Sequence, residues 1–191
     1  MSRGLLFVKW LQIIPHFVVL YVLFLAAGVV TIVAWFAILI TGRYPRGLWD
    51  FAMMTMRWGA RVTAYAGLMR DEYPPFGDEP YPVRFAMIYP EHLSRWKIFV
   101  KWLLIIPHAV ILYVLGIAWA IVTVVAWFAI LFTGTYPKSL FDFAVGYNRW
   151  NYRAYLYLLL LTDVYPPFST GPDPAPPSEY VPYAERAYGP A

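Results

Sequence analysis

The chain has 191 residues, of which 61% are hydrophobic and 14% are charged, and its mean hydropathy is +0.54. Both the hydrophobic fraction and the mean hydropathy exceed those of soluble domains and indicate an integral membrane protein. The absence of cysteine excludes disulfides, thiolate catalysis and cysteine-ligated metal sites. The net charge of +4 comes from basic residues that flank apolar runs, so we expect contacts with anionic phospholipid and none with nucleic acid.

The sequence contains a tandem repeat. A shift of 92 positions aligns residues 2–76 with residues 94–168 without a gap, and 44 of the 75 aligned pairs are identical. This predicts four regions, namely a first membrane repeat (1–76), a cytoplasmic linker with one short strand (77–93), a second membrane repeat (94–168) and a proline-rich extended tail (169–191).

Each repeat begins with an apolar run long enough to cross a bilayer. The run from Ile13 to Ile40 has 28 residues, or about 42 Å as one helix. Pro15 and Pro107 each remove a backbone hydrogen bond near the start of such a run, so we expect a kink there with an interfacial helix before it. Lys97 and Lys101 lie one turn apart beside tryptophans, the pattern of an amphipathic helix at the membrane surface.

A glycine and a Tyr-Pro pair follow each apolar run and predict a turn. Gly42 and Gly134 suit helix C-caps, and a second helix from about Leu48 to Met69 is long enough to cross back. Two spans per repeat give four spans, and an even number per repeat predicts that the repeats are parallel. The excess of basic residues beside the termini predicts a multi-pass protein of the cell membrane with both termini cytoplasmic. The sequence leaves open whether the second helix spans fully or is partly interfacial.

The linker and the tail lie outside the repeated pattern. From Val83 to Tyr89, a large apolar or aromatic side chain occupies every second position, and prolines bound the segment at both ends. This pattern predicts a short surface strand. The tail, residues 169–191, is rich in proline and favours an extended chain that becomes ordered on binding a partner.

Several repeated motifs resemble those of a known family. The segments "KWLLIIPH", "WFAILFTGTYPKSLFDF" and "RWNYRAYLYLLLLTDVYPPF", with "YPVRF" before the second copy, are similar to the bacterial membrane-protein family called domain of unknown function 4389, which is frequent in actinobacteria. The resemblance covers nearly the whole chain in two copies. It implies a helical membrane architecture and no established activity. The first copy lacks the "YPVRF" segment.

Charged residues recur along the second helix of each repeat. Spacings of seven and four residues place each set on one helix face. The two sets are Asp50, Arg57 and Arg61, and Asp142, Arg149 and Arg153. One interpretation is a site between the repeats that binds or moves an anionic lipid or a small anion. The other is that these residues fix helix packing or reach lipid phosphates from the interface.

Two histidines occupy equivalent positions directly after the prolines. We expect His16 and His108 to bond a carbonyl that the proline leaves free. A haem held from two sides is the alternative, but both histidines lie near the predicted membrane boundary and neither has a second ligand at helical spacing. We therefore predict no metal and no cofactor.

The sequence carries no motif of hydrolases, metalloproteases or nucleotide-binding enzymes. Small residues at helical spacing, a lone strand and a long tail instead leave surfaces for another membrane chain or for an oligomer. We predict a non-catalytic accessory or scaffold subunit of a membrane complex. The alternative is the lipid or anion site described above.

Overall fold

The computed structural model describes residues 4–77, 79, 81–83 and 87–172. These residues form five α-helices and no strand. The helices are α1 (Leu5–Thr41), α2 (Arg46–Ala66), α3 (Lys97–Leu104), α4 (Ile106–Thr133) and α5 (Lys138–Leu158). The all-helical class is therefore confirmed. The predicted strand lies partly outside the described residues, since 84–86 are not among them, and its described part is not in a strand.

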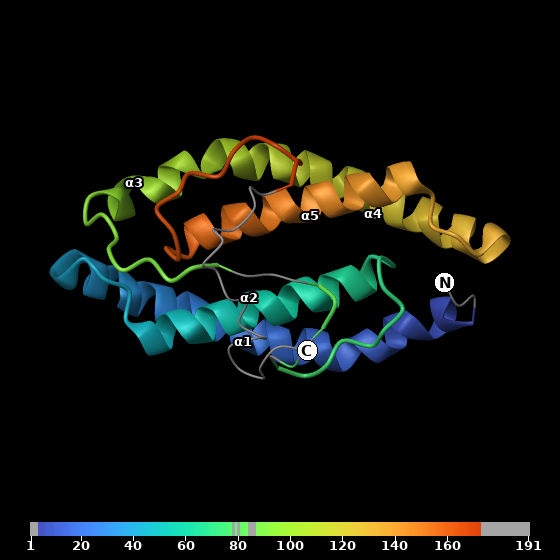
Figure 1. The fold of residues 1–191 in the computed structure, drawn as a ribbon, viewed down its shortest axis with the longest axis horizontal. Helices are drawn as coiled ribbons and strands as arrows, with labels where there is room; N and C mark the ends of the chain where they lie inside the picture. The colour runs from blue at the N-terminus through green and yellow to red at the C-terminus, as the bar shows by residue number, and fades with distance from the viewer. Residues whose placement is uncertain (1–3, 78, 80, 84–86, 173–191) are drawn as a thin grey trace.

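Each repeat folds into a helical hairpin, α1 with α2 and α4 with α5 (Figure 1). Gly42 and Gly134 end the first helices in the left-handed region at φ 72° and 78°, where a side chain would be strained. Each glycine donates its backbone N–H to the carbonyl four residues earlier. Pro45 and Pro137 are the N-cap residues that directly precede the second helices. The predicted glycine caps and turns are confirmed.

Pro15 and Pro107, at equivalent positions near the starts of the two apolar runs, have different effects. In the first repeat, α1 continues through Pro15 as one helix of 37 residues, so the separate interfacial helix predicted there is wrong. In the second repeat, α3 ends before Ile105 and α4 begins at Ile106, with Pro107 in its first turn. Proline is tolerated at that position because the N–H it lacks would be unpaired there in any case.

The repeats run in opposite directions. Phe7 near the start of α1 packs edge-on against Trp127 near the end of α4, with ring centroids 5.4 Å apart. The equivalent residues form the reciprocal contact, between Phe99 and Trp35 at 5.1 Å. In both contacts the same phenylalanine position of one repeat touches the same tryptophan position of the other repeat. Such reciprocal contacts show that a twofold axis relates the two repeats. The prediction of parallel repeats is therefore wrong. An even number of helices per repeat gives parallel repeats only when the linker begins and ends at the same end of the molecule.

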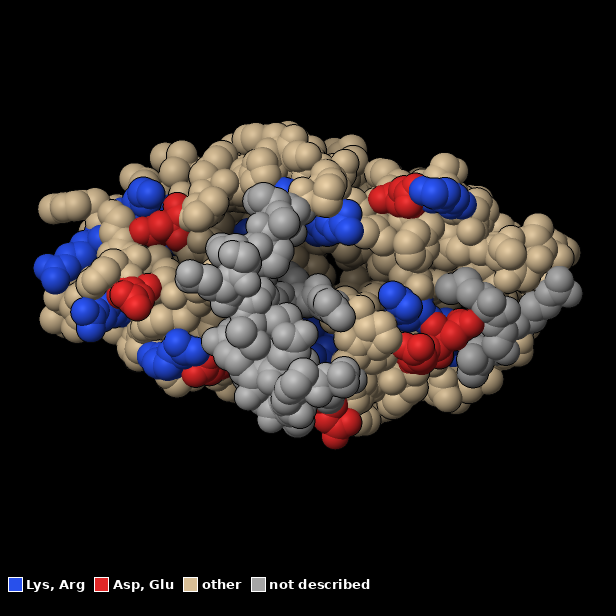
Figure 2. Space-filling model, in the orientation of Figure 1, with Lys and Arg blue, Asp and Glu red and all other residues tan. Residues whose placement is uncertain are grey.

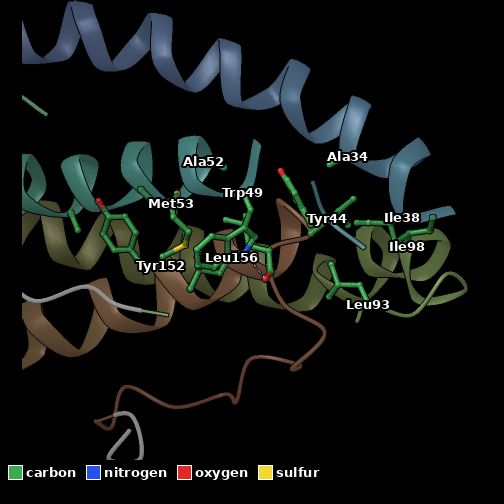
Figure 3. Close-up of a cluster of buried hydrophobic side chains, with 14 residues drawn as sticks. Ala34, Ile38, Tyr44, Trp49, Ala52, Met53, Leu93, Ile98, Tyr152 and Leu156 are labelled. Atoms are coloured by element: carbon green, nitrogen blue, oxygen red, sulfur yellow. Dashed lines mark hydrogen bonds between the residues drawn. The ribbon is translucent and has the colours of Figure 1, made fainter. Parts of the chain in front are cut away.

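The repeats join through apolar side chains at both ends of the molecule. At one end, Ile38 and Ile98 belong to the same buried cluster, and at the other end the equivalent residues Ile130 and Leu6 belong to another. Figure 3 shows the first of these clusters, in which side chains of α1 and α2 lie beside Ile98 and side chains of α5. In the same region the Trp49 indole N–H donates to the Leu161 carbonyl at 3.3 Å.

Two stretches are long and apolar enough to cross a membrane, Leu6–Thr41 and Lys97–Thr133. Only 17% of the most apolar window in each is buried, in contrast to a core helix of a soluble protein. The second helices α2 and α5 do not meet the same criterion of length and hydropathy. They occupy the middle of the molecule, with α1 and α4 outside them (Figure 1).

Candidate functional site

The polar residues of each repeat gather where the chain turns back after its second helix. Leu68 and Leu160 have positive φ angles of 60° and 62°, and each directs the chain back along its own hairpin. We call residues 67–77 and 159–171 the return loops. Positive φ in a branched residue is a strained conformation, and both leucines are buried, so packing holds them there.

A buried lysine binds the first part of each return loop. The Lys9 ammonium is 1% exposed and lies 2.6 Å from the Arg70 carbonyl and 2.7 Å from the Asp71 carboxylate. Lys101 is equally buried and lies 2.7 Å from both the Thr162 carbonyl and the Asp163 carboxylate. The sequence pattern predicted Lys101 on an amphipathic helix at the membrane surface, and the structure places its side chain inside the protein. The buried ammonium instead satisfies the loop, and a buried charge must have such partners.

The two histidines are enclosed beside the next part of the return loops. His16 Nδ1 accepts a hydrogen bond from the Trp58 indole N–H at 3.1 Å, and its ring stacks on Phe76 at 4.1 Å. His108 makes the same contacts with Trp150 at 2.9 Å and with Phe168 at 3.9 Å. Both histidines are fully buried.

Their predicted carbonyl contact is not found among the described residues, where Nε2 of both rings has no hydrogen-bond partner. A tyrosine of the return loop supplies a hydroxyl near the proline instead. Tyr73 donates to the Gln12 carbonyl and Tyr165 to the Leu104 carbonyl, both at 3.3 Å. The "YPPF" segments therefore pack against their own hairpins.

The predicted charged stripe divides into three parts. Asp50 pairs with Arg46, and Asp142 pairs with Lys138, as exposed neighbours four residues apart in the first turns of α2 and α5. Arg61 donates to the Gly77 carbonyl at 3.1 Å, and Arg153 donates to the Gly171 carbonyl at 2.7 Å. Arg57 is half-buried, and Arg149 is exposed. The structure thus brings Arg61 and Arg153 to the return loops. It does not bring them to Asp50 and Asp142, which pair with residues in the first turns of the same helices.

Sequence reasoning missed the residues that organise this site. The missed residues are Lys9, Trp58, Asp71 and Phe76 in the first repeat and Trp150, Asp163 and Phe168 in the second. All are identical between the two copies. A lysine inside an apolar run and an aspartate after the second helix, both repeated at 92 residues, were the available signal.

Charged side chains extend along the face of the molecule that Figure 2 shows. Figure 2 shows basic and acidic groups at both ends of this face and near its middle. The linker also lies on this side, where Tyr81 donates to the Glu72 carbonyl at 2.7 Å. Burial and the Glu72 carboxylate raise the pKa of Tyr81 to about 12, so this hydroxyl remains a donor at physiological pH.

An apolar pocket of about 360 Å³ lies on another part of the molecule, between α1, α3 and the end of α5. Its lining includes Thr31, Trp35, Ile98, Lys101 and Leu160, and among the described residues it contains no arginine. This pocket therefore does not correspond to the anion site predicted between the repeats. Within the described residues, no group of three His, Asp or Glu side chains is placed to hold a metal ion.

A family model described as "Domain of unknown function (DUF4389)" matches the chain twice, over residues 3–77 and 95–170. The chain belongs to this family. The two matches coincide with the two hairpins and their return loops, and they confirm the tandem repeat. No curated protein and no solved structure matches the chain.

Proposed function

We propose that the chain is a non-catalytic integral membrane protein that serves as an accessory or scaffold subunit of a larger assembly in the cell membrane. The observation that carries this proposal is the exposed apolar surface of α1 and α4. Their most apolar windows are 17% buried within this chain. Contact between such large apolar surfaces and water is unfavourable, so lipid or another chain must cover them.

The polar contacts support a structural role for the repeated residues. The side chains that acid–base or metal chemistry would use are tied to the protein's own backbone and aromatic rings. His16 and His108 are enclosed between a tryptophan and a phenylalanine, and Lys9 and Lys101 bind carbonyls and carboxylates of the return loops. A group with fixed partners supports the fold and is poorly placed to meet a substrate.

The experiment that tests the proposal is purification from native membranes in a mild detergent, followed by mass spectrometry and size measurement. We expect the chain to elute with one stoichiometric membrane complex. A variant lacking residues 173–191, which lie outside the described residues, keeps the return loop intact and should recover less of it, because a tail that orders on binding contributes contact area. A monodisperse monomer with no recovered partner, in both detergent and nanodiscs, would contradict the subunit role.

Anionic lipid binding is the second candidate, and the exposure of Arg149 favours it. Its equivalent, Arg57, is half-buried, so Arg149 is the more accessible of the two to a ligand. Arg149→Leu should reduce the ratio of co-purified anionic to zwitterionic lipid, whereas Arg43→Leu, at an exposed turn, serves as the control. An unchanged lipid ratio in Arg149→Leu would remove this candidate.

The predicted four spans with cytoplasmic termini remain a prediction. They place the turn after α1 and the turn after α4 on one side of the membrane and the linker on the other. The opposite directions of the repeats conflict with this arrangement, because they bring the end of α1 beside the start of α3. Labelling of single cysteines introduced at these positions distinguishes the arrangements.

A further inference from the structure

The linker between the repeats connects opposite ends of the molecule. Near its start, Tyr81 bonds to Glu72, shortly after α2 ends. Near its end, the Leu93 N–H donates to the Gly42 carbonyl at 2.8 Å, beside the turn that precedes α2. The linker therefore runs the length of α2, as Figure 1 shows.

This path is incompatible with helices that stand upright in a bilayer. At about 1.5 Å per residue, the 21 residues of α2 span about 31 Å, which equals the thickness of the hydrocarbon core. Upright helices would draw the linker through that core. Its described residues form no helix or strand. Lipid does not tolerate unpaired backbone groups at that depth.

The charges are also distributed unevenly among the helices. The helix α4 has no charged residue, and α1 has one, Lys9, which is buried against Asp71. From Phe17 to Ile40 the exposed side chains of α1 are apolar or aromatic. The charged face, by contrast, carries its charges along the full length of the molecule (Figure 2).

We propose that the protein is embedded in one leaflet of the membrane, with its pseudo-twofold axis along the membrane normal. The helices α1 and α4 lie parallel to the membrane plane with their exposed apolar sides among the lipid chains. The linker, the return loops and the charged residues of α2 and α5 face the water on the same side. A long in-plane helix with an apolar exposed side is stable at this depth because its backbone groups are bonded internally. This inference rests on the membrane location proposed above and is independent of any partner chain.

Four single-cysteine variants of this cysteine-free chain test the proposal. The positions are Arg43, Glu72, Glu91 and Ser139, all exposed. A membrane-impermeant maleimide is applied to sealed vesicles of both orientations, with detergent-treated vesicles as the control for full labelling. We expect all four to react from one side only. Four spans would pair Arg43 with Ser139 against Glu72 with Glu91, and upright helices in the observed arrangement would pair Arg43 with Glu91 against Glu72 with Ser139. Either two-sided pattern overturns the proposal.

Spin labels along α1 provide an independent depth measurement. Val18, Val29 and Ile40 are 62%, 62% and 72% exposed and extend over about 33 Å of helix. Collision with lipid-soluble oxygen and a water-soluble nickel complex should give nearly equal depths at the three positions. A maximum of depth at Val29 with shallow ends overturns the in-plane arrangement while leaving the membrane location intact. Water exposure at all three positions would overturn the membrane location as well.

Discussion

The two repeats offer a comparison within one molecule, because they share a framework and differ at a few positions. In both, a lysine and a histidine contact the return loop at equivalent points. The equivalent arginines, Arg61 and Arg153, bind the carbonyls of Gly77 and Gly171, which differ by two positions in the aligned repeats. The framework is local to each hairpin, and the same residues build it twice. Because the same contacts form among different neighbouring residues, the identical residues of the two repeats are sufficient to produce them.

The differences lie in the surroundings of these contacts. Asp71 is 34% exposed, whereas Asp163 is 21% exposed, so the ion pair of the second repeat is shielded more from water. In the first repeat the Tyr65 hydroxyl donates to the Gln12 side chain at 2.7 Å, and the equivalent of Gln12 is Leu104. The first repeat therefore has an additional polar contact, and the second repeat has the more strongly desolvated ion pair.

The largest expected effect is the loss of the buried lysine. Lys101→Met should destabilise the protein by about 3–5 kcal/mol, because it leaves a largely buried carboxylate without its cation. Lys9→Met should cost less, since water reaches Asp71 more easily. Thermal unfolding in detergent measures both, with Lys138→Met, which removes an exposed ion pair with Asp142, as the control. Equal midpoints for Lys101→Met and Lys138→Met would contradict the buried ion pair.

The arginines that bind the return loops should give the next largest effect. Arg61→Leu and Arg153→Leu each remove a charged donor from a loop carbonyl, at an expected cost of about 1.5–3 kcal/mol. We expect faster proteolysis within the loop of the altered repeat alone. Limited proteolysis with site mapping measures this, and Arg43→Leu is the matched control. Cleavage that increases equally in both loops would contradict the separation of the two sites.

Removal of the indole donors should act equally on the two repeats. Trp58→Phe and Trp150→Phe leave the histidine Nδ1 without its donor, which is expected to cost about 1–3 kcal/mol each. The unfolding midpoints of the two variants should agree with each other. Trp102→Phe, whose side chain is 61% exposed, should have no effect. A marked difference between the first two variants would break the equivalence of the repeats.

The smallest expected effect sharpens the difference at Gln12. Gln12→Leu makes the first repeat resemble the second and removes the acceptor of the buried Tyr65 hydroxyl, at about 1 kcal/mol. The reciprocal Leu104→Gln should leave stability nearly unchanged, because Leu104 is 41% exposed. Unfolding midpoints again provide the measurement. A loss in Leu104→Gln equal to that in Gln12→Leu would show that the side-chain amide is not the cause.

The sequence by itself determined the repeat, the glycine-capped ends of α1 and α4, and the hairpins. Apolar run length sets α1 and α4, and glycine at the required positive φ sets the turns. These features depend on residues a few positions apart, so local chemistry is sufficient to predict them. The family membership follows from the same repeated motifs.

Only the tertiary structure decided which polar residues meet and how the repeats are oriented. Lys9 and Asp71 are 62 residues apart in sequence, and His16 and Trp58 are 42 apart. Helical spacing assigns each of them to a face but does not identify the partner on another helix. The opposite directions of the repeats depend on contacts such as Phe7 with Trp127, which arise only when the two hairpins pack together. A hydrophobic pattern indicates which face of a helix is apolar. Which element packs against that face is decided only when the whole chain has folded.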